Sequence, residues 1–188
     1  DPESKTAVVV TQIPGLVTTK AVEYRFVFLS RSPNNESFAI EENGQFLGRV
    51  PTSRVDVRSI QGNYAYLTPV QSFVRSGDLP DSRSTLRFTY EWTSSGAKGW
   101  LDWFEILYRR KYEAVGDVLL FPSPDTSGVV EYSLSGFSSR DVLLFDVTDH
   151  SSVLQITGLL QDPGVAGSFR FRALDERGSV RKFLAVGP

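Results

Sequence analysis

The residues best suited to chemistry are two pairs of carboxylates, each set in or beside an apolar segment. Asp102 and Glu105 interrupt the aromatic-rich segment 100–108, and Asp146 and Asp149 close the apolar segment that begins at position 142. Carboxylate oxygens are the ligands that Ca²⁺ prefers, so Asp102, Asp146 and Asp149 are candidate calcium ligands. The favoured alternative is structural, because such carboxylates often pair with arginine or accept hydrogen bonds from loop amides. No other cofactor is predicted.

The spacing of these groups argues against catalysis. Asp102 and Glu105 are three residues apart, so on a regular strand they point to opposite faces and cannot flank one scissile bond. His150 is the single histidine, and neighbouring loop residues such as Asp149 and His150 rarely hold the geometry of a catalytic dyad. The chain has no cysteine, which excludes a disulfide, a thiolate metal site and a cysteine nucleophile. The sequence therefore predicts a non-enzymatic chain with no catalytic residue.

Aromatic side chains offer a second kind of site. A row of exposed Trp or Tyr side chains on a β-sandwich would suit stacking on sugar rings. The candidates by residue type are Trp92, Trp100, Trp103, Tyr64 and Tyr66. All five lie within apolar alternation, so packing in the core is the favoured prediction.

Composition and charge restrict the partners. The 188 residues include 20 Lys and Arg against 22 Asp and Glu, a formal charge of −2, which gives no electrostatic basis for binding nucleic acid or an anionic membrane. No apolar run reaches the roughly 18 to 20 residues that span a bilayer, so no membrane span is predicted. Because the chain contains no methionine and begins with a polar stretch, we expect a segment of a longer protein.

Alternation of apolar and polar residues with period two runs through the sequence and predicts many short strands. The clearest case is Leu86, Phe88 and Tyr90, which alternate with Arg87 and Thr89. The expected fold class is therefore all-β, an antiparallel β-sandwich of the jelly-roll or galactose-binding-like kind.

The same pattern sets the expected domain limits. Residues 1–112 are predicted to form the sandwich. Residues 113–188 are expected either to add strands to it or to form a smaller, Ig-like second part. A single helical turn is expected over 70–78, and the strand over 100–109 is expected to be central or covered on both faces.

Three segments, in order along the chain, carry a resemblance. They are residues 38–48 (FAIEENGQFLG), residues 99–110 (GWLDWFEILYRR) and residues 142–149 (VLLFDVTD), the last preceded by Gly136 and Phe137. Together they resemble the Asn-Gly hairpin, the WLDWIEV strand and the FDVTD segment found upstream of the catalytic domain in gingipain-type cysteine peptidases. That family includes the sortases of type IX secretion. The family usually has proline soon after FDVTD, whereas this chain has His150, so a different turn is expected there.

The resemblance implies a non-catalytic β-sandwich region that precedes a Cys/His peptidase domain, with residues 181–186 as the strand leading into it. The family's catalytic Cys and His have no matching positions here. The implied location is secreted or on the cell surface or outer membrane of a gram-negative bacterium. Sortases of this family cleave C-terminal sorting domains from cargo proteins and attach the cargo to surface lipopolysaccharide.

Three functions follow as hypotheses. The first is an accessory region that supports the catalytic domain or presents substrate, with the chain's own C-terminal peptidase domain and secreted cargo as partners. The second is a carbohydrate-binding module that recognises cell-surface glycans or lipopolysaccharide. The third, a free-standing hydrolase using Asp and Glu, is disfavoured by the strand geometry given above.

Overall fold

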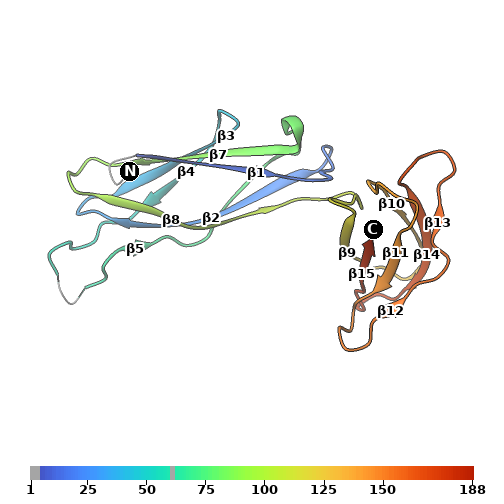
Figure 1. Ribbon diagram of the computed structural model, residues 1–188. Coiled ribbons are helices and arrows are strands. Elements are labelled where there is room, and N and C mark those ends of the chain that lie inside the picture. The colour runs from blue at the N-terminus through green and yellow to red at the C-terminus, as the bar shows by residue number, and fades with distance from the viewer. Residues whose placement is uncertain (1–4, 60–61) are drawn as a thin grey trace. The chain divides into compact units, whose positions relative to one another are not determined.

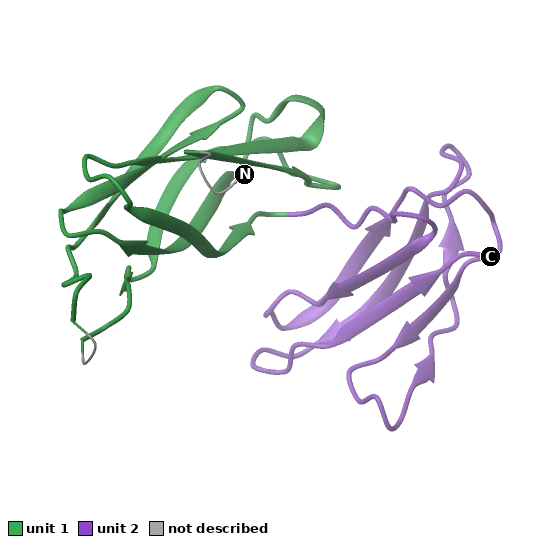
Figure 2. Ribbon diagram, turned by 60° about the vertical axis from the view of Figure 1, so that its left-hand side comes forward, with its two compact units in different colours: residues 1–109 green, residues 110–188 purple. Residues whose placement is uncertain are grey.

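The computed structural model describes residues 5–59 and 62–188. Its regular structure consists of antiparallel strands apart from one short 3₁₀ turn, η1 (Pro80–Ser82). The predicted all-β sandwich class is confirmed. The chain divides into two compact units, residues 1–109 and 110–188, called unit 1 and unit 2 below (Figure 2).

Unit 1 is built from two antiparallel sheets that pack face to face (Figure 1). The first sheet has the order β1-β7-β3-β4; its strands are β1 (Thr6–Gln12), β7 (Arg83–Glu91), β3 (Glu36–Glu42) and β4 (Gln45–Thr52). The second sheet consists of β2 (Ala21–Arg31), β8 (Lys98–Leu107), β6 (Gln71–Ser76) and β5 (Tyr66–Leu67). The long strand β2 lies at its centre and pairs with β8 along one edge and with β6 and β5 along the other.

The core of unit 1 is aromatic because the inward residues of both sheets are mostly Phe and Tyr. Phe26 and Phe28 of β2 lie against Phe88 of β7, with ring centroids 5.6 Å and 5.8 Å away, and Phe28 stacks on Phe38 of β3 at 4.2 Å. All four side chains are buried. Large flat rings fill the gap of about 10 Å between two sheets without leaving voids.

Residues 71–76 form a strand, β6, so the expected helical turn over 70–78 is wrong. β6 pairs with the first half of β2, where Phe73 lies opposite Tyr24, and Phe73 packs against the core. The segment shows a weak signal in the sequence because it is an edge strand whose inward face carries a single large apolar residue.

A fully buried carboxylate, Glu42, ends β3 inside this apolar core. Tyr24 and Ser84 donate hydrogen bonds to its Oε1, the latter at 2.6 Å, and Arg75 places its Nη1 3.3 Å from Oε2. Burial raises the pKa of Tyr24 well above its ordinary value, and the Glu42 carboxylate raises it further. A buried charge is tolerated only when paired and hydrogen-bonded, so these contacts link four strands through one side chain.

Unit 2 repeats the two-sheet plan on a smaller scale. Its sheets have the orders β10-β14-β13 and β12-β11-β15-β9. The strands are β9 (Val118–Pro122), β10 (Gly128–Leu134), β11 (Leu143–Asp146), β12 (Leu154–Gln155), β13 (Leu160–Gln161), β14 (Phe169–Asp175) and β15 (Lys182–Val186). The rings of Tyr132 and Phe171 stack at 4.7 Å in its core. Tyr132 donates a hydrogen bond to the buried Asp175, so a core tyrosine meets a buried carboxylate here as well.

We expect Glu42→Gln to destabilise unit 1 by about 3 kcal/mol, because it leaves Arg75 without its buried counter-charge. Unfolding in urea, followed by tryptophan fluorescence, measures this directly, since all three tryptophans lie in unit 1. The matched control is Glu41→Gln, which removes an exposed carboxylate 3.6 Å from Arg87 and should cost less than about 0.5 kcal/mol. Equal losses for the two variants would contradict a structural role for the buried charge.

Candidate functional site

The predicted carboxylate pair lies on β8, which contains a β-bulge. In the ladder with β2, Val27 faces Trp103 and Phe28 faces Leu101, so Asp102 is an extra residue with no partner on β2. A bulge leaves one residue unpaired and shifts the alternation of the side chains that follow it.

The regular alternation predicted for residues 100–108 does not hold across the bulge, and Asp102 and Glu105, predicted to lie on opposite faces, are both exposed. Leu101, Phe104 and Ile106 pack against the core, whereas Trp100 and Trp103 are 40% and 38% exposed. Strict alternation would have put the two tryptophans on opposite faces. Among the described strands β8 pairs only with β2, so it is an edge strand with an exposed outer face, and the expectation of a central or doubly covered strand is wrong.

Glu105 takes part in a surface ion-pair cluster. Arg25 Nη1 lies 4.0 Å from its carboxylate, and Arg25 Nε donates to Glu23 at 2.8 Å. The hydrogen bond from Arg25 lowers the pKa of Glu23 below its ordinary value. Asp102, at the bulge, is exposed. These polar groups border Trp103 and supply hydrogen-bonding partners at the sheet surface.

The second predicted group, Asp146 and Asp149, holds the turn after β11. Asp146 Oδ1 accepts a hydrogen bond from the Thr148 amide at 3.0 Å, and its Oδ2 accepts from Arg181 Nε at 2.9 Å and Nη2 at 2.6 Å. Asp149 accepts from the Ser151 amide at 2.9 Å and from its hydroxyl. His150 is exposed. These contacts are the ones expected of carboxylates that fix a loop.

The electrostatics of Asp146 agree with that arrangement. Burial alone would raise the pKa of Asp146, but hydrogen bonds from Thr148 and the Arg181 guanidinium outweigh burial and lower the pKa below its ordinary value. Among residues 5–59 and 62–188, no group of three or more His, Asp or Glu side chains is placed to hold a metal ion. Calcium binding by Asp102, Asp146 or Asp149 stays a prediction. Within the same residues, no helix is long and apolar enough to cross a membrane.

The five aromatic candidates have different surroundings. Trp92 is half-buried, packs against Tyr90 at 5.6 Å and has the Lys5 ammonium over its ring. Tyr66 is half-buried and Tyr64 is exposed, with the Arg31 guanidinium 4.3 Å from the Tyr64 ring centroid. Trp100 and Trp103 are the two that share the outer face of β8.

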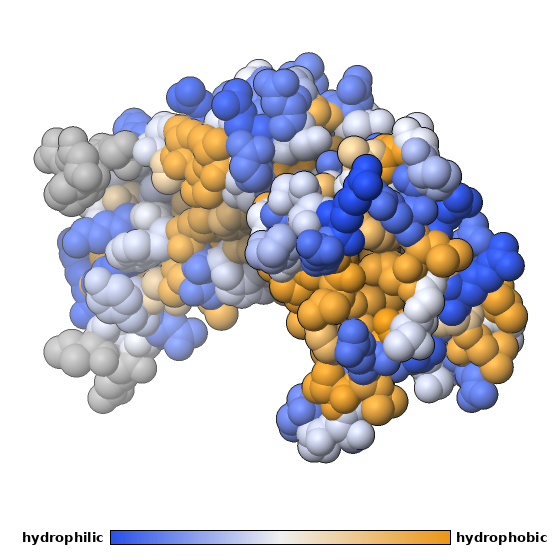
Figure 3. Space-filling model, turned by 45° about the vertical axis from the view of Figure 1, so that its right-hand side comes forward, coloured by the Kyte–Doolittle hydropathy of each residue, from blue (hydrophilic) through white to orange (hydrophobic). Residues whose placement is uncertain are grey.

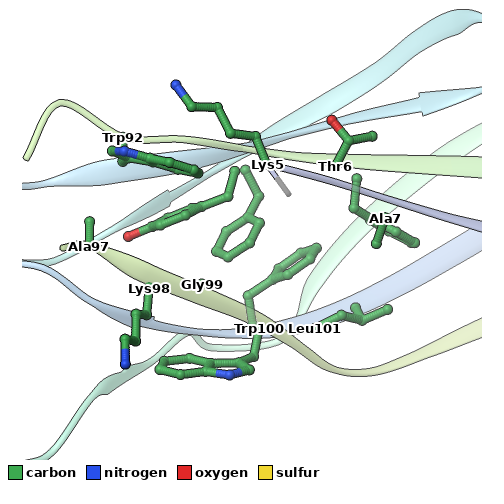
Figure 4. A pocket seen from close by; sticks show the side chains of 13 residues that line it. Lys5, Thr6, Ala7, Trp92, Ala97, Lys98, Gly99, Trp100 and Leu101 are labelled. Carbon is green, nitrogen blue, oxygen red and sulfur yellow. The ribbon is translucent and has the colours of Figure 1, made fainter. Parts of the chain in front are cut away.

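Unit 1 also has an open cleft of about 670 Å³, where the edge formed by β1 and β7 faces β8. Buried core rings, including those of Phe38 and Tyr90, line it together with Trp92. Figure 4 shows Lys5 and Trp92 on one side of this cleft and Lys98 on the other. Its titratable lining groups are Lys5, Lys98 and Tyr90.

Unit 2 has an apolar outer sheet face that sequence analysis missed. Phe121 and Phe183 point into the core and are buried, whereas the outward residues of β11, β15 and β9 are apolar in two adjacent rows. We call this set the apolar face: Val118, Leu120, Leu143, Phe145, Leu184 and Val186. Leu120 is 60% exposed and Leu143 51% exposed, and hydrophobic side chains gather broadly on the surface of unit 2 in Figure 3.

A sequence signal for this face exists. The runs VLLF at 118–121 and 142–145 are apolar without alternation, which is typical of a strand covered on both faces. In unit 2 only one face of each strand meets the core. Contiguous exposed apolar surface of this kind is typical of an interaction site.

Comparison with known proteins identifies the fold. No protein-family model and no curated protein matches the sequence. Among solved structures, the chain is similar to dimeric latent PorU from Porphyromonas gingivalis, with a TM-score of 0.68 and 12% sequence identity. The match covers 97% of this chain and 17% of the PorU chain. At this identity the likeness shows a shared fold, which extends through both units.

We expect Asp146→Asn to destabilise unit 2 by about 2 kcal/mol at pH 7, because it removes charge-assisted hydrogen bonds from Arg181. The lowered pKa means that the folded state binds the proton more weakly. The stabilisation is therefore present above the unfolded pKa of about 3.9 and is lost as the pH falls through the folded value.

Amide hydrogen exchange in peptides from β11 and β15 follows this loss in unit 2. The difference between the wild-type chain and Asp146→Asn should be large at pH 7 and shrink below pH ~4. Asp141→Asn, an exposed carboxylate just before β11, is the control and should change exchange little. A difference that is independent of pH would mean that the Asp146 charge is not the stabilising feature.

Proposed function

We propose that this chain is a non-catalytic accessory region of a secreted or cell-surface, gingipain-like cysteine peptidase of the type IX sortase kind. In this role it supports the catalytic domain or presents substrate to it. It has no catalytic residue of its own and needs no cofactor for this role. The parent protein would act at the outer membrane of a gram-negative bacterium on secreted cargo.

The observation that carries the proposal is the fold likeness to part of PorU over nearly the whole chain. It agrees with the sequence resemblance of residues 38–48, 99–110 and 142–149 to the region upstream of the catalytic domain in that family. Because fold alone does not fix function, the proposal needs a surface through which the accessory role can work.

The apolar face of unit 2 supplies that surface. Its two rows of Val, Leu and Phe side chains would stabilise a permanent contact between domains, since the centre of such interfaces is apolar and depleted of charge. The last strand, β15, contributes Leu184 and Val186. A peptidase domain joined after β15 would begin close to this sheet, and we propose it as the occupant of the apolar face.

The first test is the reading frame that encodes this chain. The proposal requires a domain with a catalytic Cys and His in the same polypeptide, C-terminal to Pro188. A frame that continues into a different class of domain, or ends without one, would overturn the proposal.

The second test uses the chain and that peptidase domain as separately produced proteins. We expect the chain to bind the domain and to raise the melting temperature of the domain. The double variant Leu120→Lys, Leu143→Lys should weaken binding at least about tenfold, because two charges would be buried at the contact. Val129→Lys changes an apolar side chain on the other sheet that is still more exposed, at 71%, and should leave binding unchanged. Binding that the double variant retains would exclude the apolar face as the contact.

A further inference from the structure

Two tryptophan side chains, Trp100 and Trp103, lie on the same outer face of β8 in unit 1. Trp100 lies opposite Leu29 and Trp103 opposite Val27 in the ladder. Leu29 and Val27 are two residues apart on β2, which places the tryptophans roughly 7 Å apart along the sheet. The bulge at Asp102 produces this arrangement, because without it only one of the two would face outward.

Apolar residues of β2 and β5 lie beside the two tryptophans. Val27, the ladder partner of Trp103, is 4% exposed although it lies on the outer side of β2, so neighbouring side chains cover it. Leu67 of β5 extends the row formed by Leu29 and Trp100. We call the surface formed by Trp100, Trp103, Leu29 and Leu67 the tryptophan platform.

Hydrogen-bonding groups border the platform. In the ladder Arg25 and Glu105 form a pair two positions from Val27 and Trp103, on the same face, and Arg25 also bonds Glu23. At the other end, Figure 4 shows Lys98 beside the ring of Trp100, across β8 from Thr6 and Ala7. Flat rings with fixed guanidinium and carboxylate groups at their border differ from the apolar face of unit 2, which has no such polar partners within its two rows.

This combination matches the chemistry of a saccharide. The faces of a pyranose ring carry C–H groups that stack on aromatic rings, while its hydroxyls need donors and acceptors at the edge of the contact. Glu105 and the exposed Asp102 place carboxylates near Trp103, and the nearby Arg25 guanidinium is already paired with Glu23 and Glu105, which disfavours a phosphate-rich polymer at this end of the platform. We infer that the tryptophan platform binds a neutral oligosaccharide, with successive sugar rings on Trp100 and Trp103. This inference does not depend on a peptidase domain.

The test uses the 188-residue chain itself. It is screened on an array of immobilised neutral glycans, and the glycan with the strongest signal is titrated as a free oligosaccharide by calorimetry. We expect binding, with Trp100→Ala and Trp103→Ala each weakening it about tenfold or more. Phe46→Ala removes an exposed ring from β4 and should leave affinity unchanged.

Thermal unfolding distinguishes loss of binding from loss of fold. Both tryptophans face outward, so their alanine variants should keep the cooperative unfolding of the wild-type chain, and Glu105→Gln should weaken binding without changing stability. Absence of binding to every neutral glycan would overturn the inference. Unchanged affinity in the Trp100→Ala, Trp103→Ala double variant would also overturn it. A third contrary result would be preferential binding of an anionic polymer such as heparin, with that binding abolished by the same substitutions.

Discussion

The buried carboxylate of Glu42 is the constraint on which the fold of unit 1 depends. An ionised group inside an aromatic core must be paired, and its partners Tyr24, Arg75 and Ser84 come from strands of both sheets. Satisfying Glu42 therefore fixes how the two sheets meet. Unit 2 uses a related contact between Tyr132 and Asp175. In both units a buried acid has a structural partner, and we assign neither acid a catalytic role.

The surfaces of the two units follow from how each sheet is covered. In unit 1 a single extra residue, Asp102, turns two tryptophans to the same outer face of an edge strand. In unit 2 the strands β9, β11 and β15 are apolar on both faces, while the core covers only one. One surface combines rings with hydrogen-bonding groups and the other is apolar throughout. The two surfaces therefore suit different partners.

Local patterns in the sequence predicted the all-β class and the loop-fixing role favoured for Asp146 and Asp149, because alternation and turn chemistry involve neighbouring residues. What sequence reasoning missed depends on distant residues or on register. Glu42 shares the inward face with Phe38 and Ile40, but its partners are 18 to 42 positions away along the chain. The bulge at Asp102 is a property of the ladder with β2, and alternation within 100–108 alone gave the wrong faces.

We propose that this chain acts through its surfaces, with the apolar face of unit 2 covered by a domain of the same polypeptide. Hydroxyl-radical footprinting can compare the isolated chain with the parent polypeptide. We expect Leu120, Leu143 and Phe145 to be oxidised in the isolated chain and protected in the parent, while Val129 reacts equally in both. Equal oxidation of all four residues in the two proteins would contradict it.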